Sequence, residues 1–60
     1  MKYKIGDSVL AEPKCGPMAG QEFMAHITDI VSGQYIVEDQ DSDFFTADED
    51  EISLLKNHRN

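Results

Sequence analysis

The most chemically distinctive feature of this sequence is a run of closely spaced carboxylates. The run comprises Glu38, Asp39, Asp41 and Asp43. Such groups can pair with lysine or arginine of a partner, and close pairs contribute substantially to binding when they are desolvated. The Asp-x-Asp-x-Asp spacing also matches the start of an EF-hand calcium loop, which needs Gly at its sixth position and Glu at its twelfth. Phe44 and Asp50 occupy those positions, so we expect no bound metal and no cofactor.

Residues that support catalysis are sparse and isolated. Cys15 is the one cysteine in 60 residues, which excludes an intrachain disulfide and a cysteine-based zinc cage. His26 and His58 stand apart from each other and from any nucleophile motif. General acid–base catalysis needs a shielded carboxylate, and a chain this short buries only a thin core. We therefore expect no enzyme activity from the monomer; only an oligomer with a shared pore at a symmetry axis would offer the shielding.

The charge balance narrows the class of partner. Twelve acidic residues against five basic ones give a net charge of −7. This argues against direct binding to nucleic acid, which requires a positive footprint, and against anionic membranes. No apolar run is long enough to span a bilayer, and the segment MKYKIGDS lacks the apolar part of a secretory signal. We expect a cytoplasmic protein, or a nuclear one in a eukaryote, with a basic partner.

Two long strands are predicted around Ser32-Gly33. Residues 22–31 and 34–39 both alternate apolar and polar side chains, and a two-residue link with Gly between such runs indicates a hairpin. Asp29 interrupts the alternation, which predicts a bulge or bend near Thr28-Asp29. The predicted inward side chains of the hairpin and of the strand before it are Val9, Ala11, Ala25, Ile27, Tyr35 and Val37.

Shorter strands complete the predicted fold. We expect one strand around residues 8–12, one at 44–47, a 3-10 turn at 48–51 and a last strand at 52–55. Residues 14–21 form a loop, in which Met18 either folds back onto the core or lines a binding surface. The fold predicted is all-β, a small five-stranded SH3-like barrel over residues 1–55 followed by a polar tail at 56–60. An open meander sheet and an OB-like barrel are the alternatives.

Several motifs resemble the Tudor family of SH3-like barrels. They are Gly6-Asp7-x-Val9-x-Ala11, Phe23-x-Ala25-x-Ile27-x-x-Ile30, Tyr35-x-Val37-x-Asp39-x-Asp41 and Glu51-Ile52-x-x-Leu55. The resemblance implies recognition of a methylated lysine or arginine in a basic peptide by a cage of aromatic rings, through cation–π attraction. Phe23 stands where the family places a cage ring, and Phe44 or Phe45 could add another. The cage is incomplete, because the family's other ring positions hold residues that are not aromatic.

We therefore predict a non-enzymatic module that binds a basic protein or peptide, methylated or not, through an acidic and aromatic barrel edge. The predicted ligand-binding residues are Phe23, Tyr35, Glu38, Asp39, Asp41, Asp43, Phe44 and Phe45. One alternative is a small acidic inhibitor, of phage or mobile-element type, that imitates nucleic acid and blocks a DNA-binding enzyme. Another is a structural subunit that forms a homodimer through an apolar face made of Leu10, Met24 and Ile36.

Overall fold

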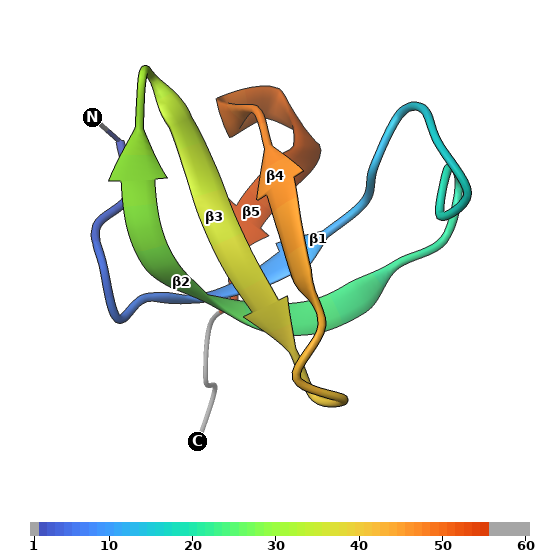
Figure 1. Ribbon diagram of the computed structural model, residues 1–60, viewed down its shortest axis with the longest axis horizontal. Helices are drawn as coiled ribbons and strands as arrows, with labels where there is room; N and C mark the ends of the chain where they lie inside the picture. The colour runs from blue at the N-terminus through green and yellow to red at the C-terminus, as the bar shows by residue number, and fades with distance from the viewer. Residues whose placement is uncertain (1, 56–60) are drawn as a thin grey trace.

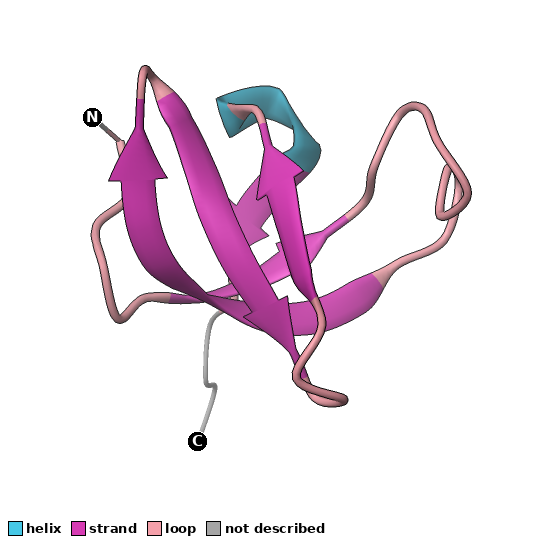
Figure 2. Cartoon of the chain, in the orientation of Figure 1, coloured by secondary structure: helices cyan, strands magenta, loops and turns pink. Residues whose placement is uncertain are grey.

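The chain folds as a single antiparallel sheet of five strands with one 3-10 turn (Figures 1 and 2). The computed structural model describes residues 2–55, so the predicted tail at 56–60 lies outside the described residues. The elements are β1 (Ser8–Ala11), β2 (Phe23–Val31), β3 (Gln34–Asp39), β4 (Phe44–Ala47), η1 (Glu49–Glu51) and β5 (Ile52–Leu54). The predicted all-β class, the five strands and the 3-10 turn before the last strand are confirmed. Residues 2–55 contain no helix that could cross a membrane.

The β2–β3 hairpin turns at Ser32-Gly33, as predicted. Both residues have positive φ, +51° at Ser32 and +80° at Gly33, which is the signature of a type I′ turn. This turn twists in the same sense as the strands that it joins. It therefore sets the β2–β3 register, in which Val31 lies opposite Gln34 and Ile30 opposite Tyr35.

A bulge bends β2 where the alternation of its side chains breaks. The pairing with β3 shifts between Ile27 and Asp29, which confirms the predicted irregularity. The extra residue returns Ile30 to the core side, where it packs against buried side chains. It also curves the strand, so that the two halves of β2 run in different directions (Figure 1).

The concave side of this curved sheet holds the hydrophobic core. All six side chains that were predicted to face inward are buried, and all of them except Ala25 are at most 1% exposed. Tyr3, Ala47 and Ile52 complete the buried set. Alternation along the strands selects the six predicted residues, because one face of the sheet is buried and the other is exposed to solvent.

The strand order is β4-β3-β2-β1-β5, and the sheet is not closed into a barrel. Within residues 2–55, β4 pairs with β3 alone and β5 with β1 alone. Both strands are short, and η1 separates them in the chain. The sheet therefore has two edges, at β4 and at β5.

We expect Gly33→Val to lower the free energy of unfolding by about 1–2 kcal/mol, because a side chain is disfavoured at positive φ. Nothing lies within 4 Å of the position that a Cβ at residue 33 would occupy, so the loss is conformational and not steric. Gly33→Asn is the control and should cost less, because Asn tolerates this conformation. Urea denaturation measures both; equal midpoints for the two variants would contradict this account of the turn.

Candidate interaction site

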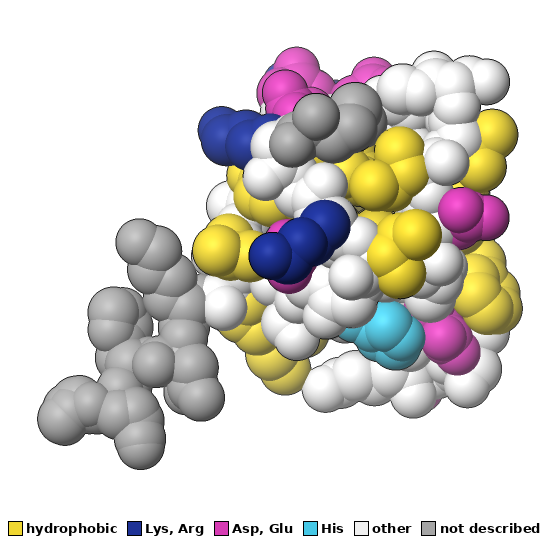
Figure 3. Space-filling model, turned by 90° about the vertical axis from the view of Figure 1, so that its left-hand side faces the viewer, with side chains coloured by type: hydrophobic (Ala, Val, Ile, Leu, Met, Phe, Trp, Pro, Cys, Tyr) yellow, Lys and Arg dark blue, Asp and Glu magenta, His cyan; other side chains and the backbone are white. Residues whose placement is uncertain are grey.

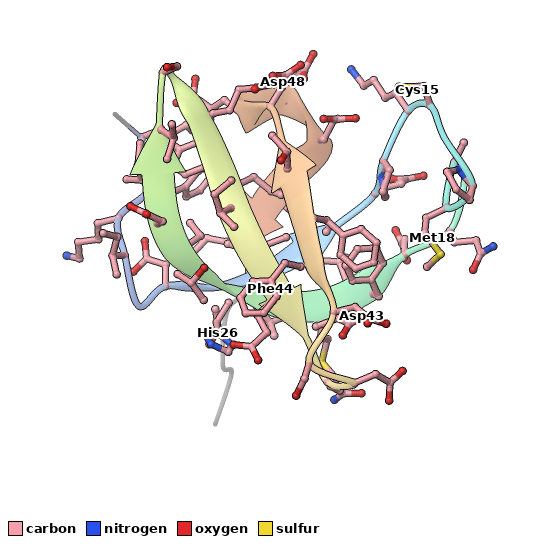
Figure 4. The ribbon with its side chains drawn as sticks, viewed as in Figure 1. Cys15, Met18, His26, Asp43, Phe44 and Asp48 are labelled. Atoms are coloured by element: carbon pink, nitrogen blue, oxygen red, sulfur yellow. The ribbon has the colours of Figure 1, made fainter. Side chains whose placement is uncertain are left out.

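The candidate site is centred on β4, which runs between two acidic segments. The turn before β4 contains Asp41 and Asp43, and the segment after it runs from Asp48 to Glu51. Figure 4 shows Asp43 and Asp48 at opposite ends of the strand. The two acidic segments of the sequence therefore flank one edge of the sheet.

The turn before β4 owes its shape to Asp39. One oxygen of this carboxylate, Oδ1, accepts hydrogen bonds from the backbone N–H groups of Asp41 and Asp43, both at 2.9 Å. The Asp39 N–H in turn donates to the carbonyl oxygen of Asp43 at 2.9 Å. Carboxylate oxygens of Asp39, Asp41 and Asp43 lie within 4.8 Å of one another. Asp39 thus acts mainly within the chain, whereas the Asp41 and Asp43 side chains are exposed.

The segment after β4 is fastened to the loop between β1 and β2. The Glu51 carboxylate accepts hydrogen bonds from the N–H of Asp48 at 2.8 Å and from the N–H of Lys14 at 2.9 Å. The Lys14 ammonium group also pairs with the Asp50 carboxylate at 2.9 Å. From the sequence, these acidic residues were expected to form a 3-10 turn and, in the nucleic-acid-mimic alternative, to belong to a run of carboxylates from Glu38 to Glu51. Their density, four in a row, was the available signal that they also form part of an acidic surface.

The Lys14–Asp50 pair perturbs both of its members. The hydrogen bond, followed by the charge attraction, lowers the pKa of Asp50 and raises the pKa of Lys14. The Asp50 contribution to stability is therefore present above its unfolded-state pKa and is lost as the pH falls through the lowered value. The Lys14 contribution is present below its unfolded-state pKa and is lost as the pH rises through the raised value. Both side chains are exposed, so this contribution is small and sensitive to salt.

The three phenylalanines do not converge. Phe23 and Phe45 contact each other with ring centroids 5.0 Å apart, and both pack against the core. Phe44 lies on the outer face of the sheet, opposite Glu38, and is 59% exposed; Figure 4 shows it on the His26 side of the sheet. The structure therefore offers one pair of rings in mutual contact and one separate ring.

Tyr35, which was also predicted to bind the ligand, is a core residue with no exposed surface. Its hydroxyl accepts a hydrogen bond from the Tyr3 N–H at 3.1 Å and donates one to the Glu49 carboxylate at 3.4 Å. The Tyr3 ring meets it edge-on, with centroids 5.6 Å apart. Tyr35 thus ties the N-terminal segment and η1 to β3, and it forms no part of a surface that a partner could touch.

A groove of about 280 Å³ runs beside β4, between this strand and the β1–β2 loop. Its lining is Pro13, Cys15, Pro17, Met18, Gln34, Phe45, Thr46, Asp48 and Glu51. Of the two arrangements that the sequence allowed for Met18, packing back onto the core or lining a surface, the structure has Met18 lining a surface groove. Apolar side chains from the loop and from Phe45 therefore lie beside the acidic segment that follows β4.

The three residues proposed for a homodimer do not form one continuous patch on the outer face of the sheet. Leu10 and Met24 lie opposite each other on β1 and β2. Ile36 is separated from them by the cross-strand pair of His26 and Glu38, whose side chains approach to 3.4 Å. Figure 3 shows the histidine beside an acidic side chain, with apolar side chains in separate places on that side of the molecule. Glu38, another predicted site residue, therefore lies on this face and not on the groove side.

We expect Tyr35→Phe to lower the free energy of unfolding by about 1–3 kcal/mol, because it leaves the Tyr3 N–H without its buried acceptor. Tyr3→Phe is the matched control. It removes a hydroxyl that donates to the Ile52 carbonyl oxygen at 3.3 Å, but it leaves no N–H donor without an acceptor. Urea denaturation of both variants measures the difference. If Tyr35→Phe lost no more stability than Tyr3→Phe, the Tyr35 hydroxyl would have no special structural role.

We expect Lys14→Gln to raise the pKa of Asp50 toward the ordinary value of about 3.9, because the two largest causes of its lowering, a hydrogen bond and a charge attraction, both come from Lys14. Lys14→Arg is the control, since it retains the charge and the donor. Titration of the side-chain carboxyl carbon by NMR gives the pKa directly. An Asp50 pKa that did not change in Lys14→Gln would show that the ion pair is absent in solution.

No protein family model matches this chain, and searches of curated proteins and of solved structures returned no match either. The resemblance to Tudor domains therefore rests on the motifs quoted from the sequence.

Proposed function

We propose that this protein is a non-enzymatic interaction module that binds a basic segment of a protein partner along β4 and its groove. The observation that carries this proposal is the position of the groove. Its apolar lining, which includes Met18 and Phe45, adjoins the carboxylates of Asp48 and Glu51. A lysine or arginine side chain suits such a place, because its apolar stem packs on the lining while its charged end meets the acid.

The charge of the whole chain favours the same partner. The net charge is −7, and the acidic turn at Asp41 and Asp43 extends the negative surface past the far end of β4. Complementary charge speeds the encounter with a cationic partner and suppresses acidic ones. The Lys14–Asp50 pair lies beside the groove, so a cation from the partner could compete with Lys14 for the same carboxylate.

We also propose that the fold is a divergent SH3-like arrangement with one open side. Five strands with a 3-10 turn before the last one support this assignment. A methyl-specific aromatic cage has less support. Phe23 and Phe45 pack against each other, so part of each ring is already covered, and Phe44 lies on the opposite face of the sheet. We therefore propose recognition of basic side chains without a requirement for methylation.

The test is calorimetric titration with a synthetic peptide that has two lysines on each side of four alternating valine and threonine residues. Raising NaCl from about 50 mM to about 300 mM should weaken binding at least about tenfold, because salt screens opposite charges. A peptide with glutamates in place of the lysines should not bind. If neither the peptide nor a panel of other lysine-rich and arginine-rich peptides binds at low salt, the proposed function is wrong.

Charge-matched variants locate the effect. Asp48→Asn/Asp50→Asn and Asp41→Asn/Asp43→Asn each remove two charges beside β4, and we expect each to weaken binding about three- to tenfold. Asp7→Asn/Asp29→Asn removes the same charge from positions that line neither the groove nor the turn, and it should have a smaller effect. Equal losses in all three would mean that net charge alone attracts the peptide.

The nucleic-acid mimic remains a distinct outcome. A pull-down from the source organism, with the captured proteins identified by mass spectrometry, separates the two functions. Capture of a nuclease, recombinase or polymerase that DNA displaces would support the inhibitor and overturn the peptide-binding proposal.

A further inference from the structure

The outer edge of β4 has backbone groups without a strand partner. The Asp39 N–H donates to the Asp43 carbonyl oxygen, which makes these two residues a hydrogen-bonded pair. In an antiparallel ladder such pairs alternate with pairs that direct their N–H and C=O groups away from each other. In the register of β3 and β4, Phe44 lies opposite Glu38. These two residues therefore form a pair without mutual hydrogen bonds, and the N–H and C=O groups of Phe44 point away from β3.

The same alternation applies along the whole of β4. Phe45 and Ala47 bond to β3, whereas Phe44 and Thr46 direct their N–H and C=O groups outward. Within residues 2–55 no second strand pairs with β4, and the backbone of these two residues makes no other hydrogen bond there. We call the N–H and C=O groups of Phe44 and Thr46 the β4 edge.

The β4 edge lacks most of the usual protections against pairing with another chain; the one that it has is its short length of four residues. Edge strands are commonly blunted by a charged residue, a proline or a bulge within the strand. β4 reads Phe-Phe-Thr-Ala, which has high strand propensity and none of these features. Its register with β3 is regular over all four residues. The edge is therefore suited to accept a further strand.

The acidic residues at both ends of β4 determine which kind of strand can pair with the β4 edge. An antiparallel pairing of two copies would place Phe44 of one copy opposite Thr46 of the other, because these residues direct their N–H and C=O groups outward. The acidic turn at Asp41 and Asp43 of one copy would then lie beside Asp48 and Glu49 of the other, and like charges brought together in this way are destabilising. A partner strand with lysine or arginine at both ends would instead place cations beside those carboxylates. The acidic ends thus disfavour self-association and favour a basic strand.

The groove adds selectivity to the edge. Phe45 and Thr46 line it from β4, and Met18 and Pro17 line it from the facing loop. Alternate side chains of an added strand point to one face of the sheet. Those on the core side would reach this apolar lining, so small apolar residues should alternate in the partner.

We propose that the basic segment binds by β-strand addition, as a sixth strand hydrogen-bonded to the N–H and C=O groups of Phe44 and Thr46. This inference rests on the proposed function and adds its mode of recognition: an extended, alternating segment of about four residues with lysine or arginine at each end. The main-chain hydrogen bonds supply affinity, and the flanking charges and the groove supply specificity.

Amide hydrogen exchange measured by NMR tests the mode with the unmodified protein. In the free protein the amides of Phe45 and Ala47 should exchange slowly and those of Phe44 and Thr46 quickly. Saturation with the lysine-flanked valine–threonine peptide should slow exchange at Phe44 and Thr46 at least about tenfold, which corresponds to about 1.4 kcal/mol. Slowing at Ile52 and Leu54, on the β5 edge, in place of β4 would overturn the inference.

A modified peptide provides a control that leaves the protein fold untouched. N-methylation of alternate residues on one edge of the peptide removes its N–H donors and keeps its charge. We expect methylation of the pairing edge to weaken binding at least about tenfold and methylation of the other edge to have little effect, because only the pairing edge donates hydrogen bonds to β4.

Variants at Thr46 give the complementary control on the protein. Thr46→Pro removes the outward N–H, and an edge strand tolerates proline at such a position; Thr46→Ala keeps the N–H. The first should weaken binding and the second should not. If the peptide binds with salt dependence but neither methylated form nor Thr46→Pro weakens it, strand addition is wrong and the proposed function stands. If no basic peptide binds, the proposed function itself fails.

Discussion

The rest of the structure depends on the bend of β2. A chain of this size buries only about 60% of the surface that its unfolded form exposes, so a flat sheet would leave its apolar face in water. The bulge between Ile27 and Asp29 curves β2, and the curvature folds one half of the sheet over the other. The enclosed space is filled by a few fully buried side chains, chiefly Val9, Ile27, Tyr35 and Val37.

Acidic side chains have two different tasks in this protein. Asp39 and Glu51 use their oxygens to accept backbone N–H groups, which shapes the turn before β4 and fastens the β1–β2 loop to η1. Asp41, Asp43 and Asp50 direct exposed carboxylates to the solvent. The first group fixes the positions of the second, so the negative charge beside β4 is placed by structure and does not result from composition alone.

The same strand supplies both an apolar groove wall and an open backbone edge. The Phe45 side chain faces the core side and reaches the groove, while Phe44 faces the outer surface. A partner segment on this edge would therefore meet backbone donors and acceptors, an apolar lining and carboxylates together. These are the components that recognition of an extended peptide uses.

The sequence by itself determined the strands, the Ser32-Gly33 turn, the bulge and the inward set of side chains. Each of these follows from local alternation and from backbone preference, which act within a few residues. The tertiary structure alone decided which phenylalanine meets Phe23, because that depends on the β3–β4 register. It also decided that Tyr35 is sealed in the core by Tyr3 and Glu49, and that Lys14 joins the acidic segment 36 and 37 residues further along the chain. Such contacts depend on how the sheet curves in space, and the spacing of residues along the chain does not show which distant segments the curvature brings together.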